Sequence, residues 1–130
     1  MRYLSLHEAL VIGQAVTGIE ARTLASASRV ELLESALHAP QAGFGDQDFY
    51  PDFFVKAAVL ASRIARNHPL PDGNKRLAWT CLVVFCELNG YEFNPPAVES
   101  VDTIVGVAAG SISEPELAEW IKSRAVPLDA

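Results

Sequence analysis

The feature that most constrains the fold is a nearly unbroken apolar run at residues 77–88. Gly73 stands ahead of this run, and the Asn89-Gly90 pair after it is a typical helix C-cap. A helix that is apolar on nearly every side is stable only when other protein surrounds it. The run is also shorter than the roughly 20 apolar residues that cross a bilayer, and it contains Glu87. We therefore expect a helix from near Gly73 to Leu88 at the centre of a folded domain.

Capping signals and helical periodicity predict five further helices. Capping-box spacing is found in the pairs Ser5 and Glu8, Ser28 and Glu31, and Ser113 and Glu116. Asp52 is a fourth candidate cap, and the His68-Pro69 pair must end the helix that follows it, because the residue before a proline is driven out of the α region. The expected helices are residues 6–16, a segment from Ser28 to before Pro40, a segment from Asp52 to His68, the central helix, residues 97–109, and a last helix after Ser113.

Signals for a sheet are weak, because no alternating run is long enough to anchor one. The expected fold class is all-α, and the length of 130 residues suits one domain covering 1–130. Residues 41–50 combine glycines and aspartates with Phe44 and Phe49, too irregularly for a helix. We interpret this segment as an exposed flap, either a loop or a short hairpin, and a second short hairpin near Tyr91 stays open.

The charge balance limits the partners of the chain. The formal net charge is −6, which repels a phosphate backbone and argues against direct nucleic-acid binding, including that of a DNA-binding repressor. Neither a leader pattern near Met1 nor a membrane span is evident, so we expect a cytoplasmic protein with no membrane partner. Cys81 and Cys86 lie within the apolar run at a spacing that places them on different sides of a helix, and we expect both to be reduced core residues.

Chemistry-bearing residues are concentrated where two expected helices meet, at residues 68–76. The amides that begin a helix near Gly73, together with the positive end of its dipole, bind anions without help from net charge. Lys75 and Arg76 add two cations, and Asp72 offers a carboxylate for Mg²⁺. His68 can accept a proton near neutral pH. This set of residues favours phosphoryl transfer from a nucleotide triphosphate such as ATP.

Residues 68–76 read His-Pro-Leu-Pro-Asp-Gly-Asn-Lys-Arg, which resembles the signature of the Fic superfamily. The Asn-Lys-Arg ending is similar to that of the Doc (death on curing) toxins within it. Segments 32–37, 88–91 and 116–121 also resemble Doc helices, so the likeness covers most of the chain. Leu70 stands where the family usually has phenylalanine, and either residue is an apolar anchor under the loop.

The resemblance implies a six-helix Fic fold and transfer of the γ-phosphate of ATP, with Mg²⁺, to a threonine of elongation factor Tu. It makes His68 the general base, Asp72 the residue that holds the metal, Asn74 a phosphate-positioning residue, and Lys75 and Arg76 phosphate ligands, with Gly73 allowing close backbone approach. It also implies a flap that docks the target protein, through Phe44, Gly45, Asp46, Phe49 and Tyr50. A Phd-like antitoxin is the expected inhibitor, because no Ser or Thr here has the Glu four residues later that self-silencing Fic enzymes carry.

Two departures bear on the type of transfer. Fic enzymes that transfer AMP carry a glycine at the position of Lys75 and an arginine at that of Trp79. A side chain at Lys75 crowds the backbone approach that glycine allows, which favours phosphate over AMP transfer. AMP transfer to a protein hydroxyl is the alternative within enzymes, and a catalytically silent binding module is the alternative outside them.

Other conspicuous residues have plainer interpretations. His7 and His38 have no matching set of functional residues around them, so we interpret both as structural or solvent-exposed. Arg66 and Asn67 are interpreted as residues of a helix end that interact with its carbonyls. Trp79 and Trp120 have the spacing of core residues. For the flap aromatics, packing under a loop and docking of a partner stay equally open.

Overall fold

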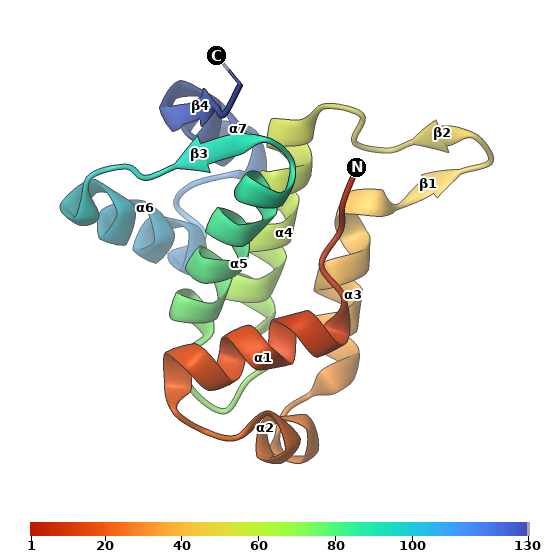
Figure 1. The fold of residues 1–130 in the computed structure, drawn as a ribbon, viewed down its shortest axis with the longest axis vertical. Coiled ribbons are helices and arrows are strands. Elements are labelled where there is room, and N and C mark those ends of the chain that lie inside the picture. Colours follow the sequence, from red (N-terminus) through yellow and green to blue (C-terminus); the bar gives the residue numbers. More distant parts are fainter. Residues whose placement is uncertain (130) are drawn as a thin grey trace.

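A computed structural model describes residues 1–129 of the chain and shows a helical bundle built around two central helices (Figure 1). Its elements in chain order are α1 (Leu6–Thr17), α2 (Ala21–Ala27), α3 (Val30–His38), the 3-10 turn η1 (Ala39–Gln41), β1 (Gly43–Phe44), β2 (Gln47–Asp48), α4 (Phe53–Asn67), α5 (Asn74–Leu88), β3 (Tyr91–Phe93), α6 (Ala97–Ala109), α7 (Glu114–Arg124) and β4 (Ala125–Pro127). The predominantly helical class expected from the sequence is confirmed.

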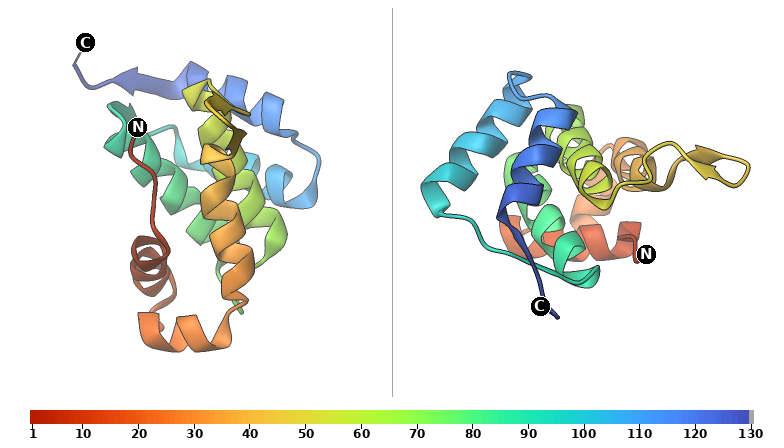
Figure 2. Two further views of the ribbon diagram at one scale, coloured as in Figure 1. Left: turned by 90° about the vertical axis from the view of Figure 1, so that its right-hand side faces the viewer. Right: turned by 90° about the horizontal axis from the view of Figure 1, so that it is seen from above.

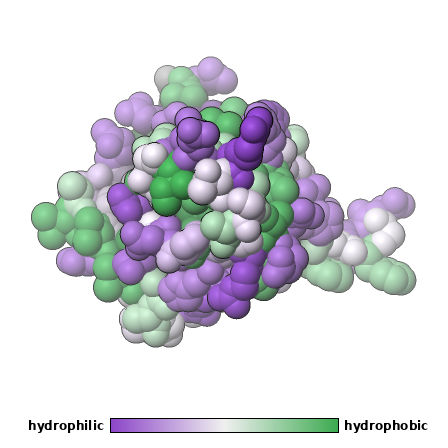
Figure 3. Space-filling model, turned by 90° about the horizontal axis from the view of Figure 1, so that it is seen from below, coloured by the Kyte–Doolittle hydropathy of each residue, from purple (hydrophilic) through white to green (hydrophobic). Residues whose placement is uncertain are grey.

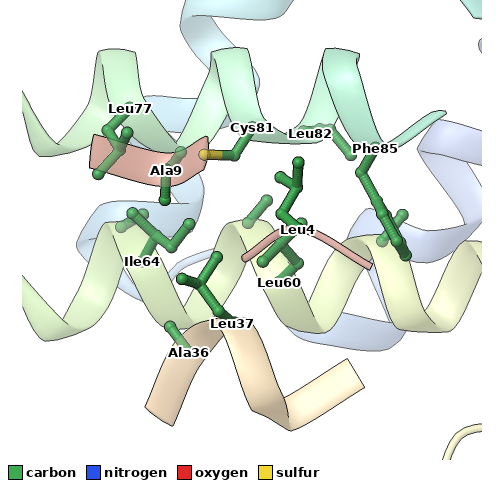
Figure 4. Packing of buried hydrophobic residues seen from close by; sticks show 14 of the residues in the cluster. Leu4, Ala9, Ala36, Leu37, Leu60, Ile64, Leu77, Cys81, Leu82 and Phe85 are labelled. Carbon is green, nitrogen blue, oxygen red and sulfur yellow. The ribbon is translucent and has the colours of Figure 1, made fainter. Parts of the chain in front are cut away.

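The central position of α5 is also confirmed. Helices α4 and α5 run in opposite directions through the middle of the molecule, and α1, α3, α6 and α7 surround them (Figures 1 and 2). Figure 4 shows Leu60 and Ile64 of α4 facing Leu77 and Cys81 of α5 in the common core. Burial raises the pKa of the thiol of Cys81 to about 12, so this cysteine is an inert core residue.

Three of the four expected helix caps form as the sequence indicates. Ser5 and Ser113 each close a reciprocal capping box with the glutamate three residues later. The carboxylate of Asp52 accepts hydrogen bonds from the amides of Phe54 and Val55, at 2.8 and 3.2 Å. These caps fix where α1, α4 and α7 begin.

The fourth cap and the helix count are corrections. Residues 1–129 contain seven α-helices, one more than expected, because residues 21–27 form α2. This helix is short and its N-cap, Glu20, makes no side-chain capping bond, so the sequence carries no start signal for it. Ser28 does not cap α3, as its spacing from Glu31 suggested; it ends α2 instead, with its amide bonded to the carbonyl of Leu24.

Of the two hairpins left open by the sequence, only the one in the flap forms within the described residues, because the strand at Tyr91 pairs with a distant segment near the C-terminus. Strands β1 and β2 make a hairpin within the flap, in which Gly43 pairs with Asp48 and Phe44 with Gln47. Strand β3 pairs with β4 near the C-terminus, so that Phe93 lies opposite Ala125. Within residues 1–129, no helix is both long enough and apolar enough to span a membrane.

Candidate functional site

His68 occupies an unusual backbone position at the end of α4. Its φ of 48° and ψ of 57° are left-handed, and no other non-glycine residue in the described part of the chain has a positive φ. Pro69 disfavours the right-handed conformation at His68, and histidine is among the residues that tolerate the left-handed one. Helix α4 therefore ends at Asn67, and His68 stands exposed at the start of the motif loop. Backbone strain of this kind is concentrated at functional sites.

The loop between α4 and α5 is held by Asn74, the first residue of α5. The amide of Leu70 donates to Oδ1 of Asn74 at 2.8 Å, and Nδ2 of Asn74 donates to the carbonyl of Leu70 at 3.0 Å. The Leu70 side chain is buried in the core, which confirms that it anchors the loop. Asn74 therefore shapes the loop in this structure, while its expected contact with phosphate stays a prediction.

Gly73 precedes α5 with a φ of 80°, a conformation that side chains disfavour. A Cβ atom at this position would also lie 2.9 Å from Cγ2 of Thr17. Glycine is thus required by both the backbone and the neighbouring helix. The turn leaves the amides of residues 74–76 without a hydrogen-bond acceptor among residues 1–129, at the positive end of the α5 dipole. These amides, called the cradle below, lie where the sequence predicts an anion site, and binding of an anion there stays a prediction.

Two cations flank the cradle. Arg76 is exposed, and its Nη1 donates to the carbonyl of Val16 at the end of α1, at 2.8 Å. This bond orients the guanidinium and leaves other N–H groups of Arg76 to bind an anion. Lys75 is also exposed and forms no salt bridge with any residue between 1 and 129. Arg66 points elsewhere, because it donates to the carbonyl of Val107 in α6 and to that of Ile112 just after α6.

Asp72 is the carboxylate nearest in sequence to the cradle, and it is exposed. In the described part of the chain, no group of three or more His, Cys, Asp or Glu side chains could hold a metal ion together. This arrangement does not suit a metal bound by protein ligands alone. Mg²⁺ is typically held by one or two carboxylates together with phosphate oxygens and water, so one carboxylate would serve only beside a bound phosphate, and binding of Mg²⁺ at Asp72 stays a prediction.

A hollow of about 1100 Å³ opens beside the cations, between α5 and α6. Its wall on α5 includes Lys75, Arg76, Trp79 and Val83, and its far end includes Glu87. Two exposed valines of α6, Val101 and Val105, lie along the other wall, and apolar surface over α6 is visible at the left of Figure 3, which views the molecule from the motif end. His68 lies outside this lining. The hollow is thus a mainly apolar trough that begins at the cations of the motif.

The flap, residues 41–50, lies away from the motif. It precedes the first residue of α4, whereas His68 follows the last, and the 15 residues of α4 span roughly 22 Å. Figures 1 and 2 show the hairpin projecting beside the opposite end of the bundle. Phe44 and Phe49 are 83% and 62% exposed, so neither packs under the loop. Any docking on the flap therefore takes place at a distance from His68.

Comparison with known proteins agrees with the motif. A family model described as the Fic/DOC family matches residues 2–86, which include α1 to α4 and nearly all of α5. The chain belongs to the Fic/DOC family. It is also 38% identical over 90 residues to a protein of Mycolicibacterium smegmatis named Toxin Doc. The aligned segment covers 69% of this chain and 66% of that toxin, slightly less than two thirds of its length.

The structure adds contacts to this Fic/DOC motif that the sequence did not reveal. The amide of Arg29, between α2 and α3, donates to the carbonyl of Pro69 at 2.9 Å. Leu24 of α2 is fully buried, and a Cβ atom at Gly13 of α1 would lie 3.0 Å from Cδ1 of Leu24 and 3.8 Å from Cδ1 of Leu70. The Arg29 amide and the Val16 carbonyl are backbone groups, so no side-chain pattern in the sequence marks them as contacts of the motif. The Trp79 and Trp120 rings lie 6.1 Å apart against the core, as their spacing predicted.

Proposed function

We propose that the chain is a Doc-type toxin that transfers the γ-phosphate of ATP to a threonine of elongation factor Tu and thereby arrests translation. The observation that carries this proposal is the exposed, left-handed His68 in the same short loop as the open amides and the two cations of α5. Membership of the Fic/DOC family and the likeness to Toxin Doc support it. The expected place of action is the cytoplasm, where this target works.

Each motif residue has a chemical role in this proposal. The imidazole of His68 accepts the proton of the threonine hydroxyl as its oxygen bonds to the γ-phosphorus. The bond from the γ-phosphorus to the bridging oxygen breaks, and ADP leaves. The amides of residues 74–76, with Lys75 and Arg76, stabilise the charge on the transferring phosphoryl group. Because these amides belong to a helix held by Asn74, they are oriented before the substrate binds.

Asp72 is the residue that we propose holds Mg²⁺ together with phosphate oxygens. When bound, Mg²⁺ neutralises negative charge on the phosphates. The exposure of Asp72 and its position one residue before Gly73 support this role. Transfer of AMP would require the α-phosphate to lie in the cradle, and the Lys75 side chain at the start of α5 argues for the γ-phosphate there.

We also propose that a Phd-like antitoxin restrains the toxin by occupying the hollow between α5 and α6. A segment of the antitoxin in this hollow would bury the apolar wall and reach Lys75 and Arg76, so it would compete with phosphate for these two cations. Acidic side chains near these cations and a basic one near Glu87 would complement the ends of the hollow. Val101 lines the hollow and is 59% exposed. Val101→Lys should therefore abolish binding of the antitoxin while leaving toxicity intact.

Growth arrest on expression in bacteria tests the catalytic role of His68. Expression of the natural chain should stop growth, and His68→Ala should not. His38→Ala is the matched control, since His38 is exposed at the end of α3 and lies outside the motif. Arrest that survives His68→Ala at equal protein levels would exclude the enzyme and support a binding module instead.

A further inference from the structure

Cations without a carboxylate partner gather near the motif, although the chain as a whole is acidic. Four of the ten Lys and Arg side chains form salt bridges, namely Arg2, Lys56, Arg63 and Arg124. The six that form none within residues 1–129 are Arg22, Arg29, Arg66, Lys75, Arg76 and Lys122. Carboxylates are not scarce, since the chain has 16 Asp and Glu residues. All but one of the unpaired cations belong to residues 22–29 or 66–76, so positive charge is left without a counter-charge in these two segments.

Arg29 is held beside the motif by its backbone. Its amide donates to the carbonyl of Pro69 at 2.9 Å, and Pro69 follows His68 in the loop between α4 and α5. Arg29 is exposed, and a change of its side chain leaves this backbone bond in place. Arg29 therefore lies at the His68 end of the loop, whereas Lys75 and Arg76 lie at its α5 end.

Arg22 extends this positive charge along α2. It is exposed and lies in the first turn of α2, whose 7 residues span roughly 10 Å. Figures 1 and 2 show α2 at the same end of the bundle as the loop that joins α4 to α5. Glu20 and Glu31 are the carboxylates nearest in sequence to these two arginines, and neither forms a salt bridge in the part of the chain that the structure describes. We call Arg22 and Arg29 the basic rim.

The basic rim is not needed to bind the triphosphate. In the proposed reaction the phosphate charge is met by the cradle, Lys75, Arg76 and Mg²⁺. The accepting hydroxyl must instead approach His68, and Arg29 lies at that end of the loop. A protein that carries carboxylates beside its accepting hydroxyl would place them against the rim, where guanidinium groups match them in charge and geometry. The net charge of −6 repels an acidic protein elsewhere, so charge complementarity favours its approach from this end.

We propose that the basic rim is a specificity site that binds acidic side chains of the protein substrate next to the accepting hydroxyl. This inference rests on the proposed function, because it takes the substrate to be a protein whose hydroxyl approaches His68. The substrate class that it predicts is a protein with Asp or Glu side chains close in space to the modified residue. The rim acts on encounter and binding and not on the chemical step, so reversal of its charge raises KM for the protein and leaves kcat and the KM for ATP unchanged.

The first test compares Arg22→Glu, Arg29→Glu and the double variant with the natural chain in steady-state transfer to elongation factor Tu. Each single reversal should raise KM for this protein roughly fivefold, and the rise should shrink at high salt, because exposed charges are screened. Arg29→Gln, which removes the charge without reversing it, should give a smaller rise.

Lys122→Glu is the matched control for these reversals. It makes the same change of net charge at an exposed, unpaired cation of α7 near β4, at the opposite end of the molecule in Figure 1. It should change KM for the protein by less than about twofold. An equal rise in Lys122→Glu, or a rise in the KM for ATP in the rim variants, would overturn the inference.

A second test needs no transfer activity. The isotope-labelled natural chain is titrated with a hexaglutamate peptide, and the amide signals are followed by NMR. Signals of residues 22–30 should move in the natural chain, and they should stay in place at high salt and in the double variant. Movement confined to residues 73–76 would overturn the inference, because the peptide would then bind only at the cradle. If the natural chain modifies no protein at all, the proposed function fails instead, and the titration still decides whether the rim binds acidic side chains.

Discussion

Asn74→Ala tests whether the motif loop depends on the side chain that begins α5. The substitution removes the two hydrogen bonds to Leu70, at 2.8 and 3.0 Å, and leaves a buried N–H and a buried carbonyl without partners. Leaving each unsatisfied costs about 1 to 3 kcal/mol, and the better helix propensity of alanine recovers roughly 0.5 kcal/mol. We therefore expect the free energy of unfolding to fall by about 1.5 to 5.5 kcal/mol, which lowers Tm by roughly 5 to 20 °C in a domain of this size.

Urea unfolding followed by circular dichroism measures this loss, with an unchanged m value showing that the unfolded state is unaffected. Asn94→Ala, at an exposed position after β3, is the control and should change the free energy by no more than about 0.5 kcal/mol. A loss for Asn74→Ala no larger than that of the control would refute the conclusion that these bonds hold the loop. Any activity should fall further than stability predicts, because the amides of α5 lose their fixed orientation.

Three further outcomes follow from the same structure. His68→Gly should lose transfer activity while its free energy of unfolding stays equal or rises by up to about 1 kcal/mol, as glycine adopts the left-handed conformation without strain; thermal unfolding checks this. Burial raises the pKa of both Cys81 and Cys86 to about 12, so native protein at pH 8 should resist iodoacetamide for hours and react fully in urea, as counted by mass spectrometry. The hydrogen bond from Arg2 helps lower the pKa of Glu8 to about 2, so the stability that Glu8 adds is full above its ordinary pKa near 4.5 and is lost as the pH falls toward 2. The difference in unfolding free energy between the natural chain and Glu8→Gln should shrink over that interval, and a difference independent of pH would contradict the assignment.

The parts of the fold that sequence reasoning predicted are those marked by local chemistry. Capping side chains at Ser5, Asp52 and Ser113 act within one helical turn, so their spacing alone locates three helix starts. The apolar run of α5 is likewise a local signal for a buried helix. Helix α2 was missed because it is stabilised by tertiary packing of Leu24 and not by a cap.

The candidate site also divides into features that local sequence predicted and features that depend on the arrangement of helices in space. Residues 68–76 form one continuous segment, so the sequence could place His68, Asp72 and the cations together. The distance between the flap and His68 could not be predicted, because it depends on the length and direction of α4 in space. The burial of Lys56 in α4 was also hidden, since a lysine in a helical pattern is normally exposed and the acceptors of its ammonium, Asp48 and Pro40, lie 8 and 16 residues away.

Transfer of labelled phosphate to elongation factor Tu tests the central claim most directly. The chain is incubated with Mg²⁺, the target and ATP labelled at either the γ- or the α-phosphate, and the modified residue is identified by mass spectrometry. We expect a phosphothreonine that carries only the γ-label, formed by the natural chain and by His38→Ala but not by His68→Ala. Incorporation of the α-label would show AMP transfer, and equal labelling by His68→Ala would contradict the assignment of His68 as the base.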